Sequence, residues 1–221
     1  MTKEAASSNG EWYSRIICPA LGLYPPDAPL HVHEEAEAYF RKKPWCNATL
    51  EEPGVISLSP SSRNPPGPEA DQLFGETLAG PRAFAHILCY FKPDDAAHLR
   101  DPARPISRVS ALFSLGPGLT GYQRILHGGM TMSIMDETTG FIFEINQALG
   151  KQGGAFNSSN VTGSLETKFL KPIPVGQVIC ATAWIERTDG RKTLVRGKIE
   201  DAAGTVLATC STTWVTLSSR M

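Results

Sequence analysis

The sequence lacks the features that mark several common classes of protein. Its five cysteines are odd in number, scattered and never form a C-x-x-C pair, so neither a disulfide framework nor a zinc site is expected. No G-x-S-x-G, Walker A or G-x-G-x-x-G motif occurs, which disfavours a serine hydrolase, a nucleotidase and a dinucleotide enzyme. The formal net charge is only -1, and this balance argues against a nucleic-acid or membrane-surface partner.

Signals for a membrane or for secretion are also missing. No apolar run is long enough for a membrane span, and the polar start MTKEAASSNGEWYSR has no apolar core of the kind that a signal peptide needs. The last three residues, Ser219-Arg220-Met221, resemble a peroxisomal address of the Ser-Lys-Leu type. A peroxisomal location and a cytoplasmic protein with an incidental polar tail both stay open.

Proline is concentrated in the first part of the chain, where eleven of the seventeen prolines precede Arg82. Glu34 to Lys43 is the one good helical run there, and residues 57–68 indicate an irregular linker or strap. His31 and His33 beside the helix start are expected to be solvated, and no metal or cofactor is predicted. We expect residues 1–81 to form a loop-rich cover with little core of its own.

The main domain, residues 82–217, precedes a short tail over 218–221 and alternates strand patterns with one long helix. Strands are expected over 84–91, 106–115, 160–170, 178–187, 192–200 and 205–217. The helix expected from Gly128 to Leu149 is apolar most of the way round, which is typical of a buried helix. Tight turns between the later strands favour antiparallel pairing. The sequence therefore predicts an α+β fold with a curled antiparallel sheet wrapped around one helix.

That architecture describes a hot-dog fold, and the helix start adds a resemblance to a known family. His127-Gly128-Gly129 followed by Asp136, with the later stretch NVTGSLETKFLKP, resembles the motif of hot-dog acyl-CoA thioesterases of the phenylacetyl-CoA thioesterase type. The resemblance is closest to members with an N-terminal extension. It implies that Asp136 is the general base or nucleophile, that the Gly128 N–H is the oxyanion donor, and that Thr162 helps to hold the attacking water.

The residue chemistry agrees with these roles but leaves alternatives. A helix N-terminus offers free N–H groups, and glycines such as Gly128 and Gly129 let a ligand approach them closely or simply let the helix start pack tightly. Asp136 is expected to be buried, which would raise its pKa, whereas Glu137 suits a solvent-facing position better. His127 could orient the thioester or cap the helix, and Thr162 could be an ordinary strand threonine. The predicted substrate-binding residues are Gly129, Gln123 and Glu137, with Gln123 standing in for the family's amide residue before the histidine.

The spacing of the motif predicts a homodimer. Eight helical residues separate Gly128 from Asp136, which is about 12 Å along the axis. One thioester carbon must lie roughly 3 Å from its attacking group, with the oxyanion donor beside the same carbonyl. Two residues of one chain therefore cannot serve one carbonyl, and a twofold pairing with sites at the interface is expected, possibly within a tetramer.

The main hypothesis is hydrolysis of an acyl-CoA to a carboxylic acid and CoA. A hot-dog enoyl-CoA hydratase is disfavoured, because no acid precedes His127 in the loop around Tyr122. An acyl-binding module or biosynthetic enzyme that acts on another thioester without hydrolysis stays open. Five cations could bind CoA phosphates or could be solvated edge charges: Lys168, Lys171, Arg187, Arg191 and Lys192. The connection from Gln147 to Ser159 is expected to shape the acyl pocket.

Overall fold

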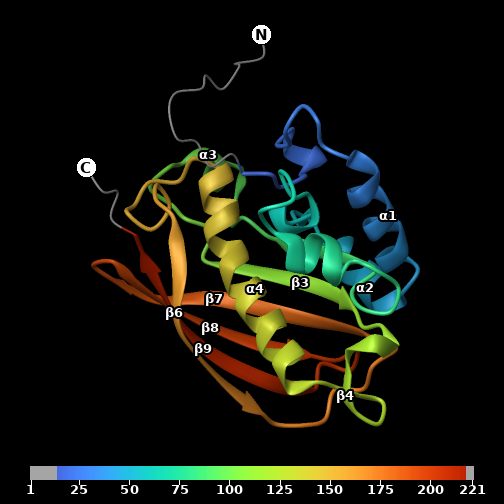
Figure 1. Ribbon diagram of the computed structural model, residues 1–221. Coiled ribbons are helices and arrows are strands. Elements are labelled where there is room, and N and C mark those ends of the chain that lie inside the picture. The colour runs from blue at the N-terminus through green and yellow to red at the C-terminus, as the bar shows by residue number, and fades with distance from the viewer. Residues whose placement is uncertain (1–13, 218–221) are drawn as a thin grey trace.

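The computed structural model describes residues 14–217, in which one long helix crosses a seven-stranded antiparallel sheet (Figure 1). The sheet order is β1-β2-β3-β7-β8-β9-β6. Its strands are β1 (Ile56–Leu58), β2 (Ile87–Phe91), β3 (Arg108–Ser114), β6 (Asn160–Phe169), β7 (Val178–Asp189), β8 (Lys192–Glu200) and β9 (Val206–Thr216). The long helix is α4 (Gly128–Ala148). The predicted hot-dog fold is thereby confirmed, whereas Ser219-Arg220-Met221 lies outside the described residues.

Helix α4 is held on the sheet by a large apolar interface. Ile134, Phe141 and Ile142 on the helix are almost wholly buried and belong to one core cluster with the inner faces of the strands. Burial of each such side chain contributes about 1.5–3 kcal/mol. Gly197 on β8 leaves room for the Cys210 side chain of β9 beneath the helix, because a Cβ there would lie 2.7 Å from the Cys210 sulfur. The middle of α4 is thus fixed in place over the sheet.

The N-terminal extension is more regular than its proline content predicts. It holds α1 (Leu30–Arg41), α2 (Pro44–Leu50) and β1, which pairs with β2 at the edge of the sheet. Helix α2 was not expected, yet Pro44 lies at its N1 position, where the missing N–H costs nothing. His33, expected to be solvated, is buried and lies 3.5 Å from the Glu37 carboxylate.

The extension covers both faces of the sheet's β1 side. Helices α1 and α2 form a second apolar cluster with Leu88, Leu112 and Val178 on the outer face, whereas Phe74 stacks on Phe84 within the main core. The segment from residue 58 to residue 78, which we name the strap, includes the short helices η2 (Ser61–Arg63) and η3 (Leu73–Thr77). It lies beside α4, as Figure 1 shows.

Two buried polar side chains fix the far end of α4. Asn146 accepts a hydrogen bond from the Ile106 N–H at 2.7 Å and donates to the Ile106 carbonyl at 2.8 Å. The Lys151 ammonium donates to the His98 carbonyl, to the Leu99 carbonyl at 3.3 Å and to the Asp101 carbonyl at 2.8 Å. These carbonyls end the short helix α3 (Ala96–Arg100), so Lys151 neutralises a helix C-terminus.

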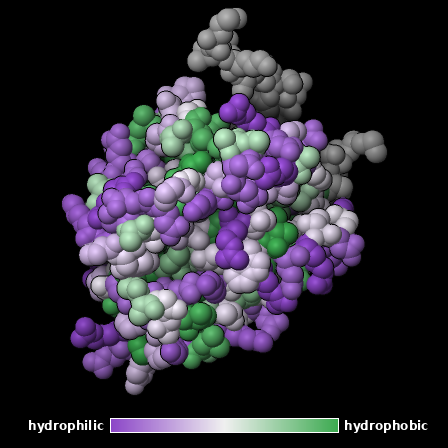
Figure 2. All heavy atoms as spheres, turned by 180° about the vertical axis from the view of Figure 1, so that it is seen from behind, coloured by the Kyte–Doolittle hydropathy of each residue, from purple (hydrophilic) through white to green (hydrophobic). Residues whose placement is uncertain are grey.

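The sheet's outer surface and its last edge differ in character. Seen from behind, the molecule is mostly hydrophilic, with small separate hydrophobic areas (Figure 2). Edge strand β6 is exposed along most of its length and carries Val161 and Phe169, which are 43% and 56% exposed. No helix within residues 14–217 is both long enough and apolar enough to cross a membrane.

Candidate active site

The N-terminus of α4 forms one part of the candidate site. The Gly129 N–H donates to His127 Nδ1 at 2.9 Å, so His127 caps the helix. The adjacent Gly128 N–H meets no acceptor within residues 14–217, as expected for the first residue of a helix. A surface cavity of about 370 Å³ opens beside Gly128 and is lined by Phe169 and Ile173. This half-site therefore presents a free backbone donor next to open space.

A short hairpin positions His127. Strands β4 (Thr120–Tyr122) and β5 (Ile125–Leu126) pair just before the helix. Gly121 packs directly on the imidazole, because a Cβ there would lie 2.6 Å from the His127 ring. Gln123 lies in the exposed turn of this hairpin and has no contact with Asp136 of the same chain. The structure therefore groups His127, Gly128 and Gly129 but leaves Gln123 apart from them.

Asp136 forms the second part, two helical turns along α4. Its Oδ1 accepts a hydrogen bond from the Thr162 hydroxyl at 2.7 Å. Thr162 precedes a bulge in β6, where Gly163 is required because a Cβ would lie 2.9 Å from Val215. Asp136 was expected to be buried, but in the single chain it is only half-buried, because β6 covers it from one side. This half-site thus presents a positioned carboxylate that is open to solvent.

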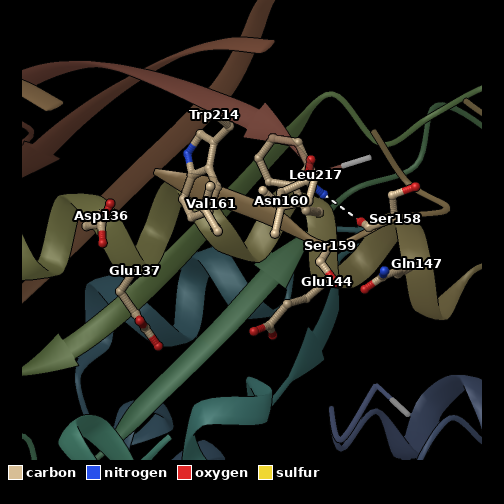
Figure 3. A pocket seen from close by; sticks show the side chains of 12 residues that line it. Asp136, Glu137, Glu144, Gln147, Ser158, Ser159, Asn160, Val161, Trp214 and Leu217 are labelled. Atoms are coloured by element: carbon tan, nitrogen blue, oxygen red, sulfur yellow. Dashed lines mark hydrogen bonds between the residues drawn. The ribbon is translucent and has the colours of Figure 1, made fainter. Parts of the chain in front are cut away.

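A cavity of about 350 Å³ extends from Asp136 along α4 (Figure 3). One wall is the Trp214 ring, whose indole N–H donates to the Thr139 hydroxyl at 3.0 Å. That hydroxyl in turn donates to the backbone carbonyl of Asp136 at 2.9 Å. Gly140 makes room for this wall, since a Cβ there would lie 3.2 Å from the indole ring. Phe143 and Val161 add apolar surface. The cavity also reaches residues 158–160, so the end of the 147–159 connection borders it.

Two more carboxyl groups line this cavity. Burial, together with the smaller effect of the nearby Glu144, Asp71 and Asp136 carboxylates, raises the pKa of Glu137 to about 8. Burial likewise raises the pKa of Glu144 to about 7, although the Ser61 N–H donates to its Oε2 at 3.2 Å and favours the charged form. Glu137, for which a solvent-facing position was preferred, is half-buried like Asp136, because the strap covers this side of α4. Glu144 was not predicted at all.

The predicted cation cluster is split within one chain. Lys168 and Lys171 lie at the end of β6 that pairs with the start of β9, where Phe169 pairs with Ala208. Arg187, Arg191 and Lys192 lie at the β7–β8 hairpin, beside the end of β9, where Lys192 pairs with Val215. Residues 14–217 hold no group of three or more histidine, cysteine, aspartate or glutamate side chains placed to share a metal ion.

Comparison with known proteins supports the resemblance at the level of a superfamily. Residues 123–208 match the family model of the thioesterase superfamily. This segment is therefore similar to domains of the thioesterase superfamily. The chain is 28% identical over 165 residues to verlamelin biosynthesis protein B of Lecanicillium sp, a match that covers 65% of this chain and 71% of that protein. It is 29% identical over 106 residues to acyl-coenzyme A thioesterase THEM4 of Xenopus laevis, a match that covers 48% of this chain and 43% of that protein.

Solved structures show weaker likeness. A Bacillus halodurans protein crystallised with CoA is 25% identical with a TM-score of 0.43, covering 51% of this chain and 70% of that chain. The PaaI protein of the phenylacetic acid degradation operon of E. coli is 16% identical with a TM-score of 0.43, covering 49% of this chain and 76% of that chain. The chain spans less than half the length of THEM4, and the phenylacetyl-CoA thioesterase type stays a prediction.

Proposed function

We propose that this chain hydrolyses acyl-CoA thioesters to a carboxylic acid and CoA. The observation that carries the proposal is the pair of half-sites on α4. A carboxylate held by Thr162 lies two turns from a helix N-terminus whose Gly128 N–H is free. General-base catalysis and an oxyanion donor are the two requirements of thioester hydrolysis. The match to the thioesterase superfamily supports the same chemistry.

In the proposed reaction, Asp136 acts as the general base. Thr162 occupies one carboxylate oxygen, which leaves the other free to take a proton from water as the water oxygen attacks the thioester carbon. The Gly128 N–H stabilises the resulting oxyanion with the positive end of the α4 dipole. The tetrahedral intermediate then collapses, the C–S bond breaks, and the CoA sulfur leaves with the proton that Asp136 had accepted.

The two half-sites are expected to meet across a homodimer. Asp136 contacts Thr162 near the start of β6, whereas Gly128 lies by Phe169 at its end, because a Cβ on Gly128 would approach that ring to 3.6 Å. Edge strands tend to pair with another chain, and β6 is an exposed edge. Antiparallel pairing of β6 with its twofold copy would place Asp136 of one chain beside Gly128 of its partner.

The test is thiol release from a panel of acyl-CoA substrates by the wild type and Asp136→Asn. The variant keeps the shape of the side chain but removes the base, so we expect kcat to fall by about 10²-fold or more. Asp189→Asn is a matched control, because Asp189 is exposed at the β7–β8 turn, and it should hydrolyse at the wild-type rate. Equal rates for the wild type and Asp136→Asn would refute the assignment.

A second candidate is favoured by one comparison. Verlamelin biosynthesis protein B is a relative by sequence, and the same site could bind an acyl thioester of a biosynthetic pathway without hydrolysing it. The two candidates differ in their products. Hydrolysis releases free carboxylic acid and free thiol in equal amounts, whereas an acyl-binding module releases neither.

A further inference from the structure

We propose that the cavity beside Asp136 receives the acyl group and selects acyl chains that carry a hydroxyl group, which Glu137 and Glu144 bind. This inference rests on the proposed thioesterase function and adds a substrate class to it. An unsubstituted acyl chain needs only an apolar lining. Here two carboxyl groups lie along the path that leads away from the reacting carbon.

The carboxyl groups form a stripe on one face of α4. Glu137, Gly140, Glu144 and Gln147 recur at intervals of three or four residues, so their side chains project from the same side of the helix. Figure 3 shows the Glu137 and Glu144 side chains on this side, pointing toward the same space. Because Glu144 follows Asp136 by eight residues, it lies about 12 Å farther along the axis. A group on the acyl chain can therefore reach the stripe while the carbonyl is at Asp136.

The strap does not satisfy these carboxyl groups. Among the described residues that line the cavity there is no lysine, arginine or histidine. Glu144 accepts a hydrogen bond from the Ser61 N–H, and the Ser61 side chain nearby also favours its charged form. The Ser62 hydroxyl lies near Glu137 and favours its charged form, yet it is 4% exposed and makes no hydrogen bond of good geometry. Both carboxyl groups are half-buried and face the cavity, so each keeps hydrogen-bonding capacity that a ligand in the cavity can use.

A hydroxyl group complements this lining better than a cation. The raised pKa values of Glu137 and Glu144 leave the pair partly protonated near neutral pH, so it can both donate and accept hydrogen bonds, as a hydroxyl does. A cation bound so near to Asp136 would stabilise that carboxylate and weaken it as a base. The remaining walls, Trp214 and Phe143, suit the methylene groups of the chain.

The test compares kcat/KM for pairs of acyl-CoA substrates of equal length, with and without a hydroxyl at successive positions. We expect one hydroxylated series to be preferred by about tenfold or more, because a site built for a hydroxyl rejects the analogue that lacks it. Glu137→Leu should lose most of this preference, because its KM should rise more for the hydroxylated substrate than for the plain one. Glu34→Gln, at an exposed position on α1, is the matched control.

Further arms separate the possible failures. Glu144→Gln retains an acceptor for the Ser61 N–H, so it tests the stripe if Glu137→Leu does not fold. Equal kcat/KM for plain and hydroxylated substrates would overturn the inference while the hydrolase assignment stands. If nothing is hydrolysed, calorimetric binding of thioether analogues decides between a hydroxyl preference, which supports the inference, and no preference, which ends it. Preference for an aminoacyl substrate over the hydroxyacyl one would also overturn it.

Discussion

Replacing Glu137 by glutamine should stabilise the protein in alkaline solution and leave it unchanged in acid. The carboxyl has a pKa of 4.5 as a free group and about 8 in the folded chain. Below pH 4.5 it is protonated in both states. Between pH 4.5 and 8 the unfolded carboxyl ionises while the folded one keeps its proton, so the wild type loses stability with rising pH. Glutamine stays neutral throughout and escapes this loss.

The magnitude follows from the shift. At about 1.4 kcal/mol for each pKa unit, a shift from 4.5 to about 8 corresponds to at most ~5 kcal/mol. Because the cavity admits water, we expect about half of this, ~2.5 kcal/mol, at pH 8.5. Urea unfolding followed by tryptophan fluorescence at pH 4.5 and pH 8.5 measures it, with Glu34→Gln as the control. The same stability difference at both pH values, or a less stable variant at pH 8.5, would refute the reasoning.

Two further predictions concern positioning and stability. Thr162→Val removes the hydroxyl that holds Asp136 while keeping the shape, so kcat should fall about tenfold, the value of one such hydrogen bond, with KM unchanged; a raised KM with unchanged kcat would contradict this. Lys151→Met leaves the carbonyls of His98, Leu99 and Asp101 without their donor and should lower the free energy of unfolding by about 3 kcal/mol. Unchanged urea unfolding of Lys151→Met would show that water replaces the ammonium.

Local patterns were sufficient to predict the main domain. The apolar periodicity of α4 and the turn signals around Gly190 predicted a buried helix under hairpin strands, and the observed helix, Gly128–Ala148, ends one residue before the predicted bound. The half-sites also follow from local rules. The distance between the helix start at Gly128 and the Asp136 carboxylate follows from the rise of the helix. Thr162 lies close to Asp136 because β6, the next strand in the sequence, runs alongside α4.

Contacts between distant parts of the sequence could not be predicted in this way. Glu137 looked solvent-facing because the periodicity of a helix does not show which segment covers it, and the strap that does so lies some 80 residues upstream. The pair Glu137 and Glu144, seven residues apart with Gly140 between them on a largely apolar helix, was the signal that could have revealed the stripe. Helix α2 was missed because Pro44 was interpreted only as the end of α1.

Complementation between two inactive variants tests the shared site most directly. Asp136→Asn lacks the base, and Gly128→Pro lacks the oxyanion N–H while the preceding His127 keeps the extended backbone that proline requires. Random re-pairing of equal amounts makes about half of the dimers mixed. Each mixed dimer has one intact site, formed by Asp136 of one subunit and Gly128 of the other, and one site that lacks both groups. The mixture should therefore recover about a quarter of wild-type activity. A mixture as inactive as its components, with mixed dimers demonstrated by differently tagged subunits, would contradict a site built from two chains.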